Sequence, residues 1–85
     1  MQTSRQFKYV ITHNFTPILF NEAMKHSDFS DHEPISAGFC RVIPRLKEHN
    51  NVEIEVKCYG ESVSLKLKPA PMDESLIQRM LAETY

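Results

Sequence analysis

The stretch NVEIEVKCYGESVSLKLKP, residues Asn51 to Pro69, carries the clearest structural pattern in the chain. Apolar and polar residues alternate on both sides of Gly60-Glu61, and this period of two is typical of strands with one buried face. A two-residue loop that begins with glycine suits a type II′ turn. That turn pairs Val56 with Leu65 on the apolar face. The sequence therefore predicts a β-hairpin centred on Gly60.

The polar face of the same hairpin supports the same register. It places Glu55 beside Lys66 and Glu53 beside Lys68, so opposite charges meet across the strands. A slip of one residue would put every apolar side chain opposite a polar one. Both faces therefore favour one pairing.

A third strand is predicted upstream, over residues 38–47, where every second residue can face the core. A three-residue connection at 49–51 would join it to the strand 51–59. The predicted pairs are Leu46 with Ile54, Val42 with Cys58, Lys47 with Glu53 and Arg45 with Glu55. Pro44 has no N–H to donate, so we expect an exposed edge or a bulge at that position.

Two further strands are predicted near the start of the chain, at residues 7–13 and 16–20, because both segments are rich in β-branched and aromatic residues. A turn at Asn14-Phe15 would pair Ile11 with Ile18 and Tyr9 with Phe20. The pair Thr16-Pro17 also suits the start of a helix, so one helix over 16–26 stays open. We prefer a strand to Phe20, then a short helix over 21–26 and a loop over 27–35.

The chain ends in a predicted amphipathic helix. Asp73 suits the N-cap, Glu74 suits the first turn, and an apolar stripe follows. The stripe consists of Met72, Leu76, Ile77, Met80 and Leu81. The predicted fold class is α+β: an antiparallel β-meander of about five strands, with the C-terminal helix packed on one face. Residues 1–6 are expected to be a flexible tail and residues 7–85 one domain.

Composition narrows the class of protein further. A chain of 85 residues with 41% hydrophobic and 25% charged residues has the composition of an ordinary globular domain. No apolar run approaches the length of a transmembrane helix, and Met1 to Lys8 lacks the apolar stretch of a secretion signal. We therefore expect a cytoplasmic protein without a membrane partner. A net charge of −1 gives no general argument for nucleic-acid binding.

The sequence predicts no catalytic residue and no cofactor. Cys40 and Cys58 are far apart in sequence, and the predicted strands turn both thiols toward the core, where a thiol is unreactive. The chain contains none of the common glycine-rich phosphate-binding or nucleophile motifs. The two cysteines are interpreted as small core residues.

One loop gathers side chains that could bind a metal, namely His26, Asp28, Asp31, His32 and Glu33. Imidazole and carboxylate groups together suit zinc, iron or manganese. Their spacing matches no ligand pattern, and polar loops collect such residues for backbone capping. We therefore expect no metal site and keep a metal-dependent enzyme as the third hypothesis.

The remaining hypotheses concern binding. The interaction candidates are the outward residues of the third strand, Phe39, Arg41, Ile43 and Arg45. A protein partner or a second copy of the chain is the first hypothesis, because the core is small and a sheet edge is exposed near Pro44. Nucleic-acid binding through basic residues of the sheet face comes second. Only Phe39 is expected to offer a base a stacking group there, and Glu53 and Glu55 share that face.

Four strings resemble small uncharacterised proteins of bacteria, phages and mobile elements. They are HSDF (26–29), ISAGFCRV (35–42), CYGESVSLKLKP (58–69) and DESLIQRML (73–81). The resemblance covers about two thirds of the chain. It implies an accessory or regulatory role, and it brings no known activity and no functional residues.

Overall fold

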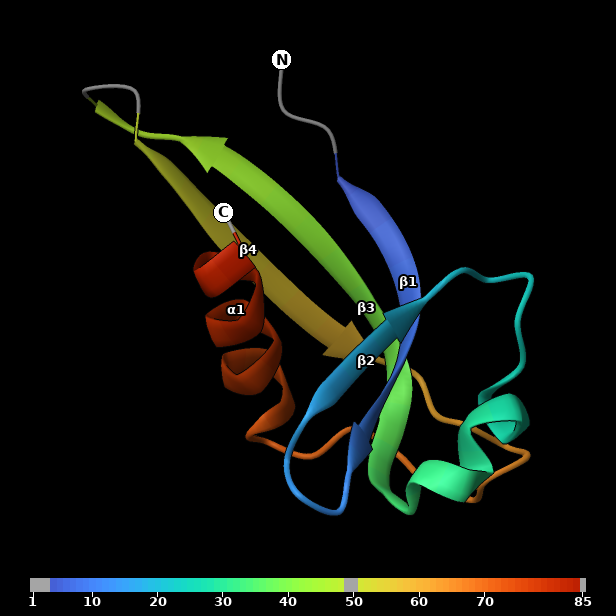
Figure 1. The fold of residues 1–85 in the computed structure, drawn as a ribbon. Helices are drawn as coiled ribbons and strands as arrows, with labels where there is room; N and C mark the ends of the chain where they lie inside the picture. The colour runs from blue at the N-terminus through green and yellow to red at the C-terminus, as the bar shows by residue number, and fades with distance from the viewer. Residues whose placement is uncertain (1–3, 49–50, 85) are drawn as a thin grey trace.

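The computed structural model describes residues 4–48 and 51–84, and four strands form one antiparallel sheet within them (Figure 1). The elements are β1 (Arg5–Thr12), β2 (Pro17–Phe20), the 3₁₀-helix η1 (His26–His32), β3 (Pro34–Leu46), β4 (Val52–Tyr59) and α1 (Asp73–Thr84). The strand order is β2-β1-β3-β4. The predicted α+β class is confirmed, but the sheet has four strands and not five. β1 begins inside the segment 1–6 expected to be a tail.

The turn between β1 and β2 is one residue longer than predicted. The Phe15 N–H donates to the Thr12 carbonyl at 2.9 Å, and Phe15 has a φ of 63°. A third turn residue in the left-handed region is a known way to close a hairpin. Tyr9 consequently pairs with Leu19, so the predicted pairing of Tyr9 with Phe20 is wrong by one residue. This shift sends Phe20 to the face opposite Tyr9.

β3 is one of the two inner strands, with β1, and is longer than predicted. It pairs with β1 on one side and β4 on the other, in a register that sets Val42 opposite Val56 and Pro44 opposite Ile54. The predicted register between β3 and β4 is therefore wrong by two residues. Because a shift of two keeps every side chain on its own face, the predicted inward and outward positions survive. Within the described residues, pairing with β1 ends where Val42 lies opposite Arg5.

The predicted hairpin at Gly60 does not form. Instead, Ser62 and Leu67 exchange two backbone hydrogen bonds of 2.7 and 3.1 Å around a tight turn. The free edge of β4 is partly occupied by α1, since the Glu74 carboxylate accepts the Cys58 N–H at 2.8 Å. No strand 62–69 therefore lies beside β4. The predicted contacts of Val56 with Leu65, Glu55 with Lys66 and Glu53 with Lys68 are wrong.

The sheet has a hydrophobic core on each face. The face covered by α1, here called the inner face, contains Tyr9, Ile11, Cys40, Ile54, Val56 and Ile77. The other face, here called the outer face, contains Val10, Phe20 and Ala37, packed against Ile18, Phe29, Leu65 and Leu67. Leu65 and Leu67, the apolar residues that alternate with polar ones after Gly60, therefore reach the core of the outer face from a turn and not from a strand.

The short helix follows the second strand, as expected, but at a later position. It is η1 at 26–32 rather than a helix at 21–26, and the single helix over 16–26 is ruled out by β2. His26 anchors η1, because its buried Nε2 lies 2.8 Å from the Gly38 carbonyl oxygen. The His26 ring also packs edge-on against Phe20 and Phe39, with centroids 5.5 Å apart in each case. The segment 27–35, predicted to be a loop, is mostly helix and strand.

A buried carboxylate fixes the start of α1. Asp73 is fully buried; its Oδ2 accepts the Tyr9 hydroxyl at 2.6 Å and the Ala70 N–H at 2.8 Å, and its Oδ1 accepts the Ser36 hydroxyl at 2.8 Å. The predicted helix at the C-terminus is confirmed. The carboxylate faces the sheet and the preceding residues, not the first turn of the helix, so the predicted N-cap role of Asp73 is wrong.

We predict that Asp73→Ala lowers the free energy of unfolding by roughly 3 kcal/mol or more. The substitution leaves three donors in a buried site without their acceptor, and each unpaired group costs about 1–3 kcal/mol. Urea denaturation measures the change, with exposed Asp31→Ala as the matched control, expected within about 0.5 kcal/mol of the parent. Equal stability of the two variants would contradict this role of Asp73.

Candidate interaction surface

The candidate metal ligands near the start of η1 are used in the fold. The His26 ring is directed at the Gly38 carbonyl inside the molecule. The Asp28 carboxylate accepts the Lys25 N–H at 3.0 Å and so caps the first turn of η1. The two side chains therefore serve different partners.

The other three candidates lie toward the end of η1. The Glu33 carboxylate lies 3.3 Å from His13 Nδ1 at the surface, and the His32 ring lies beside Phe29 with centroids 5.9 Å apart. Asp31 and His32 both border a shallow hollow against the β1–β2 turn. Among residues 4–48 and 51–84, no three His, Cys, Asp or Glu side chains come together to hold a metal ion.

The two thiols lie directly opposite each other on β3 and β4. Both belong to the inner-face core, which confirms their predicted inward orientation. Burial raises the pKa of Cys40 from 9.0 to about 12, and Cys58 adds a smaller electrostatic contribution. Burial also raises the pKa of Cys58, to about 11, although the Tyr9 hydroxyl opposes this shift. Neither thiol has the low pKa of a nucleophile.

These shifts predict a loss of stability at alkaline pH. Above pH 9 the thiols of the unfolded chain release protons that the folded chain retains up to about pH 11 to 12. The free energy of unfolding should therefore fall as pH rises, by roughly 1 kcal/mol per pH unit from Cys40. Tyr9, whose pKa burial and the Asp73 hydrogen bond raise above 10.0, adds to the fall at higher pH.

Urea denaturation at a series of pH values measures this slope. Cys40→Ala should reduce the slope between pH 9 and 11, whatever it does to stability at neutral pH. An unchanged slope in that variant would show that Cys40 ionises equally in the folded and the unfolded protein.

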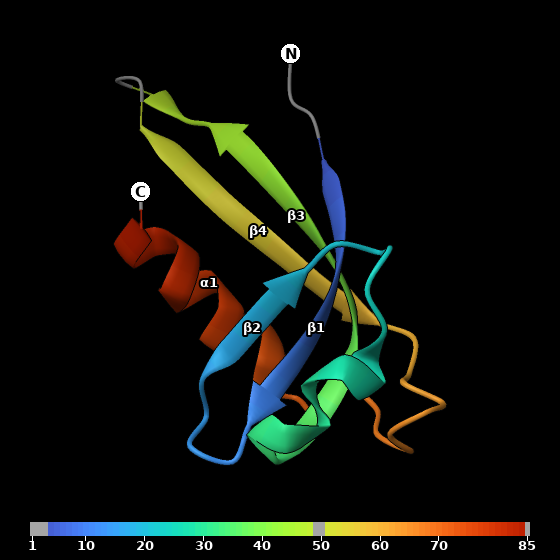
Figure 2. The same cartoon turned by 45° about the vertical axis from the view of Figure 1, so that its right-hand side comes forward.

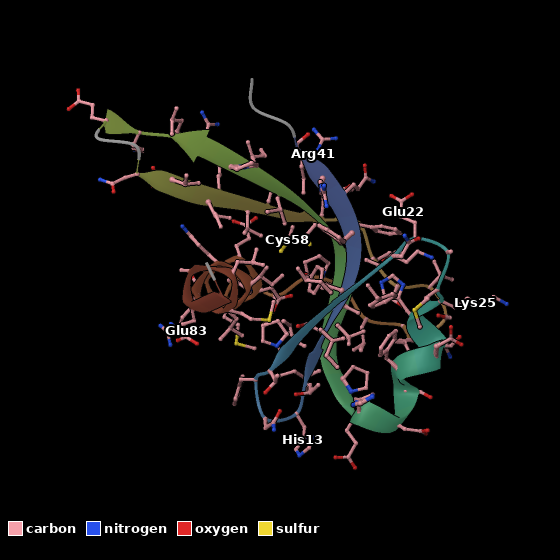
Figure 3. All side chains as sticks on the ribbon, turned by 45° about the horizontal axis from the view of Figure 1, so that its top comes forward. His13, Glu22, Lys25, Arg41, Cys58 and Glu83 are labelled. Carbon is pink, nitrogen blue, oxygen red and sulfur yellow. The ribbon has the colours of Figure 1, made fainter. Side chains whose placement is uncertain are left out.

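The interaction candidates share one exposed surface. β3 and β4 extend past the ends of α1 and β2 as a two-stranded arm (Figure 2). The outer face of β3 and β4, including the base of the arm where β3 also pairs with β1, carries Phe39, Arg41, Ile43 and Arg45 from β3, and Glu53, Glu55, Lys57 and Tyr59 from β4. We call this set the outer arm face. Arg41 projects to the side away from α1, whereas Cys58 lies between the strands and α1 (Figure 3).

Most charges on the outer arm face are paired. Arg45 Nη2 lies 2.5 Å from Glu55 Oε2, and Lys57 Nζ lies 3.3 Å from Glu55 Oε1. Arg45 and Lys57 together hold the pKa of Glu55 below its usual range. Lys47 pairs with Glu53 at 2.5 Å. The ion pairs predicted from sequence for Arg45 and Lys47 are therefore present. In the observed register, each pair joins residues that are diagonal neighbours across the two strands and not direct partners.

Arg41 differs from its neighbours. It is exposed, it lies directly opposite Lys57, and no described carboxylate lies within ion-pair distance of it. Like charges that face each other across two strands repel and weaken the pairing. Within the part of the chain that the structure describes, the cation at the centre of this surface therefore has no carboxylate partner.

A hollow of about 260 Å³ marks the middle of the outer arm face. Arg41, Ile43, Lys57 and Tyr59 line it. The rings of Phe39 and Tyr59 lie next to it, nearly parallel, with an interplanar angle of 20° and centroids 5.9 Å apart. The hollow therefore combines two cations, an aliphatic side chain and the ring of Tyr59, against which Phe39 is stacked, a combination that can bind an anion with a flat apolar part.

Sequence reasoning placed six of these residues on the outward face, namely Phe39, Arg41, Ile43, Arg45, Glu53 and Glu55, but did not include Tyr59. The alternation along β4 contained the necessary signal, because Tyr59 follows Glu53, Glu55 and Lys57 at intervals of two. The expectation of a hairpin at Gly60 directed attention to the strand after Tyr59 instead. Tyr59 doubles the aromatic content expected for this face.

No protein-family model, curated protein or solved structure matches the chain. Within the described residues, no helix has the length and apolar character needed to cross a membrane.

Proposed function

We propose that this chain is a non-enzymatic binding protein that holds an anionic partner on the outer arm face. The observation that carries the proposal is Arg41, an exposed cation opposite Lys57 for which the described residues supply no carboxylate. The repulsion between Arg41 and Lys57 is relieved when an anion lies between them. An accessory role of this kind agrees with the resemblance to small proteins of bacteria, phages and mobile elements.

The local charge supports an anionic partner although the whole chain carries −1. On the outer arm face, the three cations Arg41, Arg45 and Lys57 outnumber the two carboxylates Glu53 and Glu55, which leaves a difference of +1. The two carboxylates are already paired. Since exposed charges act over about 8–10 Å in physiological salt, this local excess governs what approaches the hollow.

Chromatography on immobilised heparin tests the proposal without knowledge of the natural partner. Arg41→Glu should elute at clearly lower salt than the parent protein at pH 7, because it reverses the cation at the hollow. Arg79→Glu, which makes the same change on the exposed side of α1, should elute close to the parent. Elution of both variants at the same salt concentration would refute an anion site on this face.

Self-association is a second candidate, supported by the inner face of the same arm. A groove of about 400 Å³ lies there, lined by Arg5, Phe7, Leu19, Val42, Pro44, Val52, Ile54 and Leu81. Leu46 and Val52 beside it are 67% and 61% exposed. We propose that a second copy of the chain covers this groove, because a small domain gains stability by burying surplus apolar surface in a symmetric dimer.

Sedimentation velocity over a range of protein concentrations tests self-association. The parent chain should shift from monomer to dimer, and Val52→Lys should weaken dimerisation at least tenfold by placing a charge in the interface. Val63→Lys is the matched control, because Val63 is 79% exposed and lies on the 62–67 turn, away from the groove. A parent chain that stays monomeric at all concentrations would exclude the dimer.

A further inference from the structure

We infer that the anionic partner of the outer arm face is single-stranded nucleic acid, with bases stacked on Phe39 and Tyr59 and phosphates held by Arg41 and Lys57. The inference rests on the proposed function and names its ligand class. Its basis is the order of residues along the arm, in which an aromatic pair and a cationic pair occupy neighbouring positions on one face.

The aromatic pair offers an accessible stacking surface. Phe39 and Tyr59 face each other across β3 and β4, and Tyr59 is 38% exposed. Behind them, the His26 ring packs against Phe39, and Gly60 lies so close that an added Cβ would come within 2.7 Å of the Phe39 ring. Phe39 is therefore held firmly, whereas Tyr59 presents more of its ring to solvent. Pre-positioned rings bind a base at a lower entropic cost than mobile ones.

The cationic pair lies two positions closer to the tip of the arm. Arg41 follows Phe39 by two residues on β3, and Lys57 precedes Tyr59 by two residues on β4. Arg41 and Lys57 are thus displaced from the rings by about 7 Å along the arm, at roughly 3.3 Å per residue. A base stacked on Tyr59 would leave its backbone over the hollow between the two cations. Aromatic groups beside a basic groove are the general means by which proteins bind single strands without reading their sequence.

An acidic protein would use the cations but would gain less from the ring pair. Duplex DNA also fits poorly, because its bases are stacked on one another and an open sheet face cannot reach their planes. Glu53 and Glu55 lie toward the tip of the arm; Glu53 is paired with Lys47, and Glu55 is shared between Arg45 and Lys57. They limit the site to the ring pair, the cation pair and the hollow between them.

Fluorescence anisotropy with labelled mixed-sequence 12-nucleotide DNA and RNA tests the inference. The parent protein should bind single strands more tightly than the corresponding duplex. Two phosphate contacts predict a slope of about −1.4 in the logarithm of affinity against that of salt concentration, and Arg41→Gln should reduce its magnitude by about 0.7. Arg79→Gln, on α1, should leave both affinity and slope unchanged. Equal binding of DNA and RNA would mean that either kind of single strand can be the ligand. A preference for RNA would indicate contacts to the 2′-hydroxyl.

Tyr59→Leu isolates the contribution of stacking. It keeps an apolar side chain at an exposed position, so the fold should persist, as urea denaturation would verify. Affinity for single strands should fall on the order of tenfold, with little change in the salt slope. Unchanged affinity in this variant, or duplex binding equal to single-strand binding, would overturn the inference.

The outcomes separate this inference from the proposed function. If heparin retention depends on Arg41 but the oligonucleotides do not bind, the anion site stands and single-stranded nucleic acid is excluded. Stronger displacement of heparin by poly-glutamate than by oligonucleotides would then identify an acidic protein as the partner. If Arg41 affects neither ligand, both proposals fail.

Discussion

The buried carboxylate of Asp73 connects the parts of this fold that are distant in sequence. It accepts hydrogen bonds from Tyr9 on β1, Ser36 on β3 and the backbone of Ala70 before α1. A buried carboxyl group of this kind is tolerated only while its hydrogen-bond donors stay in place, so the arrangement penalises any other position of the helix. The position of α1 in turn covers one half of the inner face and part of the free edge of β4.

That position determines which surfaces remain available. The helix covers the inner face near Cys40 and Cys58, while η1 and the 62–67 turn cover the outer face around Val10 and Phe20. The chain passes from the turn to the helix beside Gly38, where an added Cβ would lie 2.9 Å from the Pro69 ring. Toward its tip, the arm of β3 and β4 exposes the apolar residues Leu46 and Val52 on its inner face and charged residues on its outer face.

Alternation in the sequence predicted the sides of the sheet better than it predicted the partners of each strand. The inward cysteines, the outward residues from Phe39 to Arg45 and the final helix followed from period and composition, because these depend on neighbours in sequence. The strand registers depend on the turns. The turn at Phe15 could not be predicted, because a bulky residue such as phenylalanine rarely adopts a positive φ. The segment after Gly60 was predicted to be a strand because Leu65 and Leu67 alternate with polar residues. In the structure they alternate because both leucines pack against the outer-face core from a turn.

The outer arm face also shows why net charge is a poor guide to the partner of a small protein. The acidic residues that make the chain negative overall are partly used within the fold, as Asp73 and Glu74 are at the start of α1. On the arm, Glu55 is shared between Arg45 and Lys57, and among the described residues no carboxylate lies within ion-pair distance of Arg41. Each carboxylate that the fold or a neighbouring cation neutralises removes a competitor for an external anion. The local surplus of cations beside two parallel rings, and not the sum over the chain, therefore sets the chemistry that this surface can bind.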